Sequence, residues 1–192
     1  MLFTVNLFYV FIYTQSTPYL PPLFTFRFTR KRRESVVSET DVILIVEDRE
    51  DDILLIQRAF QRAFLTNPAQ FVRDGEDAIQ YLRGTGKFAN RAEYPLPVLI
   101  LLDLKLPRID GFAVLAWIRQ QEGFRDLPII VLTTSNQVRD VNRAYRLGAN
   151  SFLVKEIDFQ QTVDQAKLLR EFWLNKGLKP EVSRPPRKPS EL

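Results

Sequence analysis

Residues 98–107 read VLILLDLKLP, five aliphatic residues that lead into an aspartate. An uninterrupted aliphatic run of this length is typical of a strand that is buried on both faces of a parallel sheet. Residues 42–46, VILIV, and residues 128–132, PIIVL, show the same pattern, and polar residues follow each of them. The sequence therefore predicts at least three buried parallel strands.

Two shorter strands and five helices complete the pattern. Residues 70–73 and 151–154 are expected to be strands two and five, and segments with apolar residues at helical spacing follow every strand. The helices are expected to begin near Glu50, Gly75, Gly111, Asn136 and Asp158, and Gly148 is placed to end the fourth. This alternation predicts a doubly wound α/β fold, a five-stranded parallel sheet flanked by five helices, in the flavodoxin-like order 2-1-3-4-5.

Composition restricts the chemistry that this chain can perform. Its 192 residues include neither cysteine nor histidine. Disulfides, thiolate or imidazole metal sites, Ser-His-Asp triads and a phosphohistidine on this chain are therefore excluded. Carboxylates, hydroxyls, lysine, arginine and the backbone must carry any function.

The net charge of +4 comes from the two ends of the chain, because residues 39–175 alone carry a net charge of −3. We interpret residues 1–38 as a disordered or non-native extension, 39–176 as one folded domain, and 177–192 as a disordered, proline-rich basic tail. A nucleic-acid partner is not expected, because the folded part lacks the basic excess that such binding needs.

The apolar run 2–13 does not predict membrane insertion. A bilayer-spanning helix needs about 20 apolar residues, and this run is shorter. The basic cluster 30–33 follows the run, whereas a secretory signal carries its positive charges first. We expect a cytoplasmic protein, with a short membrane-surface segment left as an alternative.

The residues that follow the strands predict the functional site. Glu47 and Asp48 follow the first strand, Asp103 the third, Thr133 the fourth and Lys155 the fifth. In a doubly wound sheet these positions meet at one edge, where ligands bind. Oxygen ligands without histidine or cysteine select Mg²⁺, Mn²⁺ or Ca²⁺, and one divalent ion would cancel the summed charge of three acids and one lysine.

Each of these residues alone has an ordinary structural explanation. An acid or a threonine at the end of a strand is usually a helix cap or a turn residue, and a single lysine is usually a solvated surface charge. Capping does not explain why acids, a hydroxyl and an ammonium follow four different strands. The combination therefore favours a functional site.

These residues resemble the motifs of bacterial response-regulator receiver domains. The resemblance covers residues 41–175 and is carried by IVED (45–48), LLDLKLP (101–107) with Asp110-Gly111, VLT (131–133) and FLVK (152–155). The long loop 84–97 and its segment YPLP (94–97) resemble the small stand-alone regulators that pair with phytochrome-type histidine kinases. The resemblance implies a stand-alone response regulator of a two-component phosphorelay that acts through protein–protein contacts.

The family's functional residues can be carried over to matching positions. The resemblance implies that Asp103 is the phosphoacceptor for a sensor histidine kinase, with Thr133 and Lys155 contacting the phosphoryl group. It also implies a Mg²⁺ site, with these ligands: Glu47, Asp48, Asp103 and the main-chain carbonyl of Lys105. It places Phe152 at an aromatic switch position coupled to Thr133. No enzyme activity is implied beyond the domain's own phosphoryl transfer and slow dephosphorylation.

The sequence departs from the family after Lys155, where Glu156 replaces the usual proline. We expect a trans peptide bond there, because a cis bond before a residue other than proline costs about 2.5–4 kcal/mol. A receiver-like binding module that is never phosphorylated remains an alternative. A phosphatase of the haloacid-dehalogenase type would need a second aspartate at the position of Lys105, so it is disfavoured.

The last expected helix, 158–175, carries two apolar stripes. Phe159, Val163, Ala166, Leu169 and Trp173 form one stripe, which is enough to cover the sheet. Leu168 and Phe172 form a second stripe turned about 100° from the first. This second stripe predicts either packing under a neighbouring helix or, together with Tyr145, a symmetric homodimer.

Overall fold

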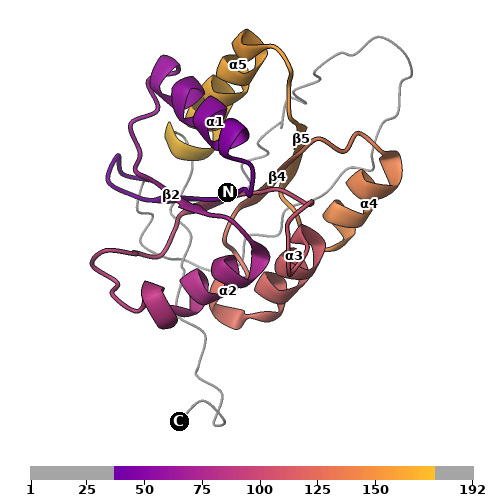
Figure 1. The fold of residues 1–192 in the computed structure, drawn as a ribbon. Helices are drawn as coiled ribbons and strands as arrows, with labels where there is room; N and C mark the ends of the chain where they lie inside the picture. Colours follow the sequence, from indigo (N-terminus) through magenta and orange to yellow (C-terminus); the bar gives the residue numbers. More distant parts are fainter. Residues whose placement is uncertain (1–36, 176–192) are drawn as a thin grey trace, which may run out of the picture. The chain divides into compact units, whose positions relative to one another are not determined.

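The computed structural model describes residues 37–175, which fold around one parallel sheet (Figure 1). The strands are β1 (Ile43–Val46), β2 (Ala69–Val72), β3 (Leu99–Leu102), β4 (Ile129–Thr133) and β5 (Ser151–Val154). They pair in the order β2-β1-β3-β4-β5, and all four pairings are parallel. The predicted fold and strand order are therefore confirmed.

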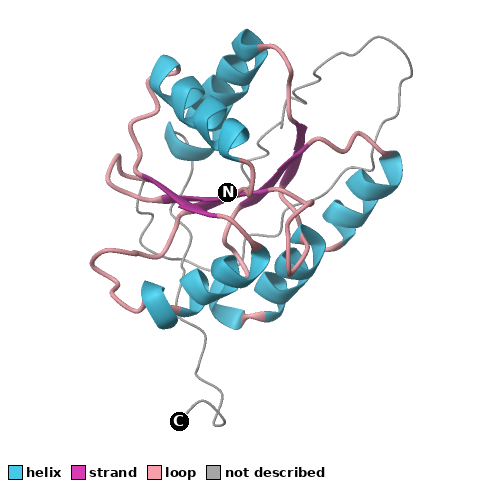
Figure 2. Cartoon of the chain, in the orientation of Figure 1, coloured by secondary structure: helices cyan, strands magenta, loops and turns pink. Residues whose placement is uncertain are grey.

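The helices lie on both faces of this sheet (Figures 1 and 2). They are α1 (Glu50–Arg62), α2 (Gly75–Arg83), α3 (Gly111–Gln120), α4 (Val138–Arg146) and α5 (Phe159–Leu169). Helices α1 and α5 cover one face, and α2, α3 and α4 cover the other. Short 3-10 turns follow α2 and α3, at Gly86–Phe88 and Glu122–Phe124.

The buried strands divide the core into two layers. Alternate residues of β1 point to opposite faces, so Leu44 and Val46 join the core under α2, α3 and α4, while Ile43 and Ile45 join the core under α1 and α5. Because both faces are covered, the central strands β1 and β3 are apolar at every position, whereas the edge strands β2 and β5 are only partly buried and admit Gln70 and Ser151. This explains the uninterrupted aliphatic runs.

Aspartates fix the starts of three helices. The side chains of Asp74, Asp110 and Asp158 accept hydrogen bonds from the third backbone amide beyond each, in α2, α3 and α5 respectively. After the carboxyl end of α4, Gly148 has φ +96°, the left-handed conformation that ends helices. The three aspartate caps thus define the geometry where the chain leaves the carboxyl ends of β2, β3 and β5, and Gly148 defines the turn before β5.

The last helix differs from the prediction in two ways. It is α-helical only to Leu169, and a π-helical segment, Arg170–Asn175, completes it. Val163, Ala166 and Leu169 are buried as expected, but Phe159 is 40% exposed, so its placement in the inward stripe was wrong. Helical side chains lean towards the preceding turn, and Phe159 has none because it begins the helix.

The predicted terminal segments, 1–38 and 177–192, lie almost wholly outside the described residues. Within residues 37–175, no helix is long and apolar enough to cross a membrane.

Candidate functional site

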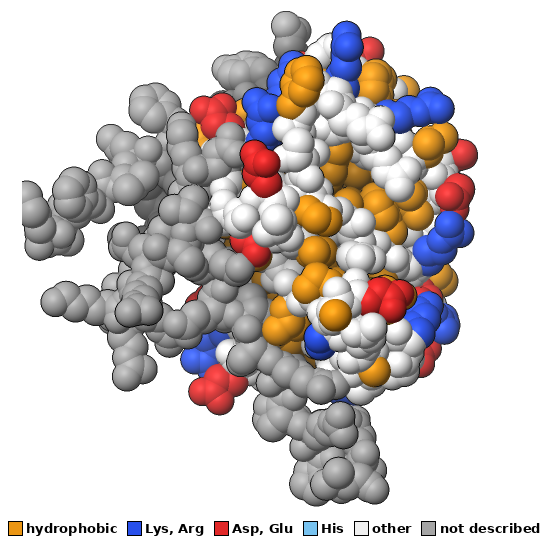
Figure 3. Space-filling model, turned by 90° about the vertical axis from the view of Figure 1, so that its left-hand side faces the viewer, with side chains coloured by type: hydrophobic (Ala, Val, Ile, Leu, Met, Phe, Trp, Pro, Cys, Tyr) orange, Lys and Arg blue, Asp and Glu red, His pale blue; other side chains and the backbone are white. Residues whose placement is uncertain are grey.

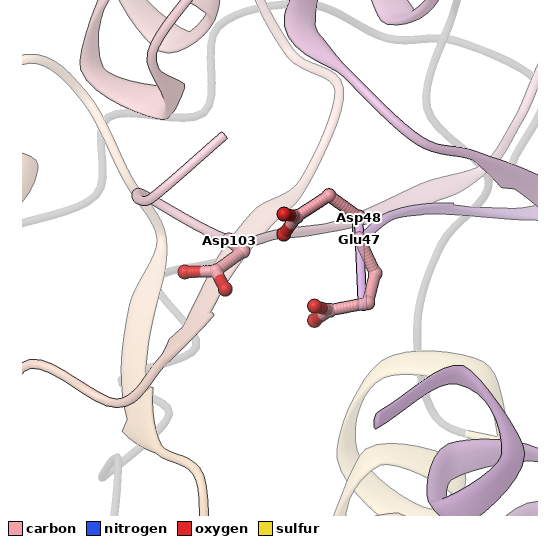
Figure 4. Close-up of side chains that lie close together, drawn as sticks. All are labelled: Glu47, Asp48 and Asp103. Atoms are coloured by element: carbon pink, nitrogen blue, oxygen red, sulfur yellow. The ribbon is translucent and has the colours of Figure 1, made fainter. Parts of the chain in front are cut away.

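Three carboxylates converge at the carboxyl ends of β1 and β3 (Figure 4). Glu47 and Asp48 directly follow β1, and Asp103 directly follows β3, its neighbour in the sheet. One oxygen from each carboxylate lies within 4.8 Å of the others. Glu47 and Asp103 are buried and Asp48 is partly buried, so this edge of the sheet concentrates negative charge.

Lys155 supplies the positive charge at this cluster. Its Nζ lies 2.7 Å from Asp103 Oδ2 and 2.5 Å from Glu47 Oε2. The residue follows β5, whose partner β4 lies between it and β3, so the ammonium reaches across the end of β4. The lysine side chain is only 11% exposed, and the three residues form a desolvated ion cluster.

A fourth acid, Asp52, was not among the predicted site residues. Its Oδ2 accepts a hydrogen bond of 2.8 Å from Lys155 Nζ. From the sequence, Asp52 is one of three acids in the first turn of α1, which suit a helix N-terminus. The available signal was its proximity in sequence, because only three residues separate the end of β1 from the start of α1.

Asp103 is held by donors on several sides. The backbone amide of Lys105 donates to its Oδ1 at 3.1 Å, and Lys155 Nζ donates to its Oδ2. Burial alone would raise the pKa of Asp103, but hydrogen bonds from Lys155, Thr133 and the Lys105 amide, with the lysine charge, hold it below its usual range. Asp103 is therefore ionised at neutral pH and can act as a nucleophile.

The pKa of Glu47 shifts in the opposite direction from that of Asp103. Burial raises its pKa to about 7, although the hydrogen bond and charge of Lys155 lower it. The two acids share one lysine, but Asp103 has two further donors, Thr133 and the Lys105 amide, whereas within residues 37–175 Glu47 has one, the Arg49 amide at 3.2 Å. One lysine thus leaves negative charge at this edge insufficiently compensated.

This donor set fits a hard divalent cation. Glu47, Asp48 and Asp103 offer carboxylate oxygens from a compact group, which suits Mg²⁺, Mn²⁺ or Ca²⁺. The incomplete compensation of Glu47 by Lys155 is what a bound cation would relieve. Lys105, whose carbonyl was predicted to be a further ligand, lies beside Asp103 and directs its amide to that carboxylate.

The loop from β3 to α3 is closely packed. Gly111 N donates to the Leu104 carbonyl at 3.0 Å, and a Cβ at Gly111 would lie 2.1 Å from the carbonyl oxygen of Asp103. Only glycine permits this approach. The guanidinium of Arg108 contacts the buried carboxylate of Asp74 at the start of α2, which ties the loop to that helix.

Thr133 and Phe152 lie on adjacent strands. Thr133 is buried at the end of β4, and Phe152 pairs with Val131, two residues earlier on that strand. Alternation along a strand puts Thr133, Val131 and Phe152 on the same face of the sheet. Phe152 is partly buried and packs against the core under α2, α3 and α4.

The segment after Lys155 has a trans backbone, as expected for Glu156. No cis peptide bond occurs between residues 37 and 175, and this range includes the bond from Lys155 to Glu156. The lysine reaches three carboxylates with that backbone in place.

Comparison with known proteins identifies the family. Residues 43–167 match the family model for the response regulator receiver domain. The chain is 40% identical over 136 residues to a probable methanogenesis regulatory protein, FilR2, of Methanothrix harundinacea, covering 69% of this chain and 83% of that protein. It is 37% identical over 133 residues to the response regulator Rcp1 of Synechocystis sp., covering 69% of this chain and 88% of Rcp1.

Solved structures give the same result. The phosphorylated cyanobacterial phytochrome response regulator RcpA is 38% identical, with a TM-score of 0.68 over 73% of this chain and 99% of that one. The Mn²⁺-bound form of Rcp1 is 36% identical, with a TM-score of 0.66 over the same shares, 73% and 99%.

The chain therefore belongs to the response regulator receiver domain family. It resembles stand-alone response regulators such as Rcp1, and its function is in a two-component phosphorelay with a histidine kinase as partner. Receiver domains bind a divalent metal, and the acidic cluster of this chain suits one.

Proposed function

We propose that Asp103 accepts a phosphoryl group from a histidine of the partner kinase. The observation that carries this proposal is the placement of an ionised, buried aspartate between Lys155 and two further acids at the edge of the sheet. The P–N bond to the kinase imidazole breaks and its electron pair stays on the imidazole. A P–O bond forms at the same time with an oxygen of the Asp103 carboxylate.

Transfer of a loose phosphoryl group is catalysed mainly by positioning and by stabilisation of charge on its oxygens. Lys155 Nζ lies 2.7 Å from Asp103, so its ammonium is placed to pair with a phosphoryl oxygen. Thr133 is buried at the end of β4 and would donate its hydroxyl to another. The phosphoryl group would draw Thr133 towards it, and Phe152 would adjust by packing alone because it has no hydroxyl.

We propose Mg²⁺ as the metal, held by Glu47, Asp48, Asp103 and the carbonyl of Lys105, with water completing the shell. When bound, the ion supplies positive charge that neutralises the transferring oxygens. The chain's own part is to hold these acids together at the ends of β1 and β3, with the charge of Lys155 beside them.

The similarity to Rcp1 and RcpA supports a phytochrome-type kinase as the partner. We infer a cytoplasmic regulator without enzyme activity beyond its own phosphorylation and dephosphorylation, and without a nucleic-acid or membrane partner. On the face shown in Figure 3, Lys and Arg side chains are mixed with Asp and Glu around hydrophobic ones, and the described residues visible there form no broad basic area. We retain residues 39–176 as the receiver domain, with 1–38 and 177–192 outside it.

A homodimer through the last helices is also proposed. Phe172, on the second stripe, is 46% exposed, and Tyr145 on α4 is also an exposed aromatic side chain. Val154 of the edge strand β5 lies exposed as well. Large apolar side chains that remain at the surface favour an interface.

Labelling by acetyl phosphate tests the phosphorylation proposal. We expect wild-type protein to become phosphorylated only with Mg²⁺, and Asp103→Asn to remain unlabelled. Asp164→Asn, which alters an exposed acid on α5, should label like wild type. Failure of the wild type to label under any divalent ion would instead favour a receiver-like binding module that is not phosphorylated.

A further inference from the structure

Asp52 contacts the predicted site, although the resemblance to receiver domains assigned it no role. Its carboxylate accepts a 2.8 Å hydrogen bond from Lys155, and its side chain is only 21% exposed. Ile53, in the first turn of α1, is buried, and Ile56 and Phe60 of the following turns pack in the core under α1 and α5, which holds the start of the helix at this edge. The contact therefore comes from the core packing of α1.

A general effect of acids at a helix N-terminus does not explain this contact. Glu50 and Asp51 occupy the same turn and are exposed, so they can interact with the helix dipole without reaching the site. Arg49 also approaches Asp52, but at 3.6 Å and from an exposed position, where an ion pair contributes little. Lys155 is thus the principal partner of Asp52.

The hydrogen bonds of Lys155 show what Asp52 contributes. An ammonium group has three N–H donors, and Lys155 Nζ faces three carboxylates, those of Glu47, Asp52 and Asp103. Glu47 and Asp103 belong to the acidic group that suits a metal, whereas Asp52 does not. A cation and a phosphoryl group would engage Glu47 and Asp103, and Asp52 would be left as an acceptor for Lys155.

We propose that Asp52 is a positioning residue that holds the ammonium of Lys155 beside Asp103 throughout phosphorylation. This inference rests on the proposed function, because Lys155 must meet the incoming phosphoryl group. Asp52 provides a fixed anchor on α1 for a flexible side chain that extends from the end of β5. A preorganised cation stabilises the transition state without having to move during transfer.

Rates of labelling by acetyl phosphate at saturating Mg²⁺ and phosphodonor test this role in the full-length chain. Asp52→Ala should label about tenfold more slowly than wild type. Asp52→Asn keeps an oxygen acceptor and should recover most of the rate. Asp51→Ala removes a neighbouring exposed acid and is the matched control, so it should behave like wild type.

The ε-ammonium resonance of Lys155 in ¹⁵N NMR spectra reports on positioning without phosphorylation. It is assigned by its absence in Lys155→Met. A hydrogen-bonded ammonium exchanges its protons slowly, so the signal should persist in wild type and Asp52→Asn. It should broaden or vanish in Asp52→Ala.

Two results would overturn the proposal. If Asp52→Ala and Asp52→Asn both labelled faster than wild type and to the same extent, Asp52 would act only through charge repulsion with the phosphodonor. If Asp52→Ala matched wild type in rate and in the Lys155 signal, it would have no positioning role. Unlabelled wild type would refute the proposed function instead. The ε-ammonium resonance of Lys155 would still test whether Asp52 positions the lysine. Asp52→Asn is nearly isosteric and keeps the test valid if the alanine variant does not fold.

Discussion

Lys155 lies among three carboxylates, so its removal should affect metal binding and phosphoryl transfer in opposite directions. In Lys155→Met, the acids lose a competing cation, and we expect Mg²⁺ to bind at least about tenfold more tightly. Labelling of Asp103 should nevertheless slow, because no ammonium meets the phosphoryl oxygens. Calorimetric titration with Mg²⁺ and labelling kinetics measure the two effects.

Lys167→Met is the control for this substitution, because Lys167 pairs with Asp164 on the exposed surface of α5. Lys167→Met should change neither the affinity for Mg²⁺ nor the rate of labelling. Weaker Mg²⁺ binding in Lys155→Met would show that the lysine supports the metal site rather than competing for its ligands.

Tyr81 makes stability depend on pH in the alkaline range. Its hydroxyl donates to the Pro95 carbonyl at 2.8 Å, and burial raises its pKa to about 12. A raised pKa means that the fold favours the neutral phenol, so this stability is complete below the unfolded pKa of about 10 and is lost as the pH rises towards 12. Tyr81→Phe should lower the free energy of unfolding by about 1 kcal/mol at neutral pH, and its stability should fall less than that of wild type as the pH rises.

Urea unfolding of wild type and Tyr81→Phe at several pH values between 8 and 11 measures this difference. The free energies of unfolding should converge as the pH rises above 10. Parallel curves throughout that range would show that Tyr81 does not titrate differently in the fold.

Among the connections between elements, the partly buried side chain of Arg119 joins α3 to the segments that precede β4 and β5. It donates to the carbonyls of Leu127 and Gly148 at 2.8 and 2.9 Å, and to Asn150 Oδ1 at 2.9 Å. Burial lowers its pKa to about 10, so it remains a cation at neutral pH. Arg119→Met would remove the side-chain donor from the carbonyls of Leu127 and Gly148, while Asn150 Oδ1 would keep its bond from the Ile129 amide, and it should lower the free energy of unfolding by about 3 kcal/mol.

This contact lies at the amino ends of the strands, opposite the acidic edge. Arg119→Met should therefore bind Mg²⁺ as wild type does at temperatures where it is folded. Chemical denaturation combined with Mg²⁺ titration separates the two effects. A loss of Mg²⁺ affinity as large as the loss of stability would mean that the two edges are coupled.

The elements that the sequence predicted well are those with strong local signals. The continuous aliphatic runs predicted β1 and β3 to within one residue at each end, because strands buried on both faces admit few polar residues. The expected start of α4 near Asn136 was two residues early, since Gln137 precedes the helix without a side-chain cap. The π-helical end of α5 carries no local signal that distinguishes it from an α-helix.

The site residues likewise divide into those with a signal in the sequence and those without one. Topology alone brings residues after parallel strands to one edge, so Glu47, Asp48, Asp103, Thr133 and Lys155 could be placed together before any contact was known. Asp52 was not predicted as a site residue, because it contacts the site from a helix, through the packing of α1 on the sheet. The link between Arg108 and Asp74 joins residues 34 positions apart and has no periodic signature.

At the scale of the whole molecule, the exposed aromatic side chains of α4 and the last helix predict association. Sedimentation of wild type should show a dimer that an acyl-phosphate mimic at Asp103 strengthens, by a coupling of about 1–3 kcal/mol. Phe172→Glu should be monomeric, because a charge would be buried in the interface. Ala92→Glu, which places the same charge at an exposed position of the loop between α2 and β3, is the control and should dimerise normally.

Identical monomeric behaviour of wild type and both variants, with and without the mimic, would exclude this dimer. The receiver would then transmit its signal as a monomer.

The central claim is that one aspartate, Asp103, receives the phosphoryl group. After incubation with acetyl phosphate and Mg²⁺, borohydride reduces an aspartyl phosphate to homoserine, and peptide mass spectrometry locates the converted residue. We predict conversion at position 103 alone, and none when Mg²⁺ is withheld. Conversion at position 48 or 52 in place of 103 would contradict the account.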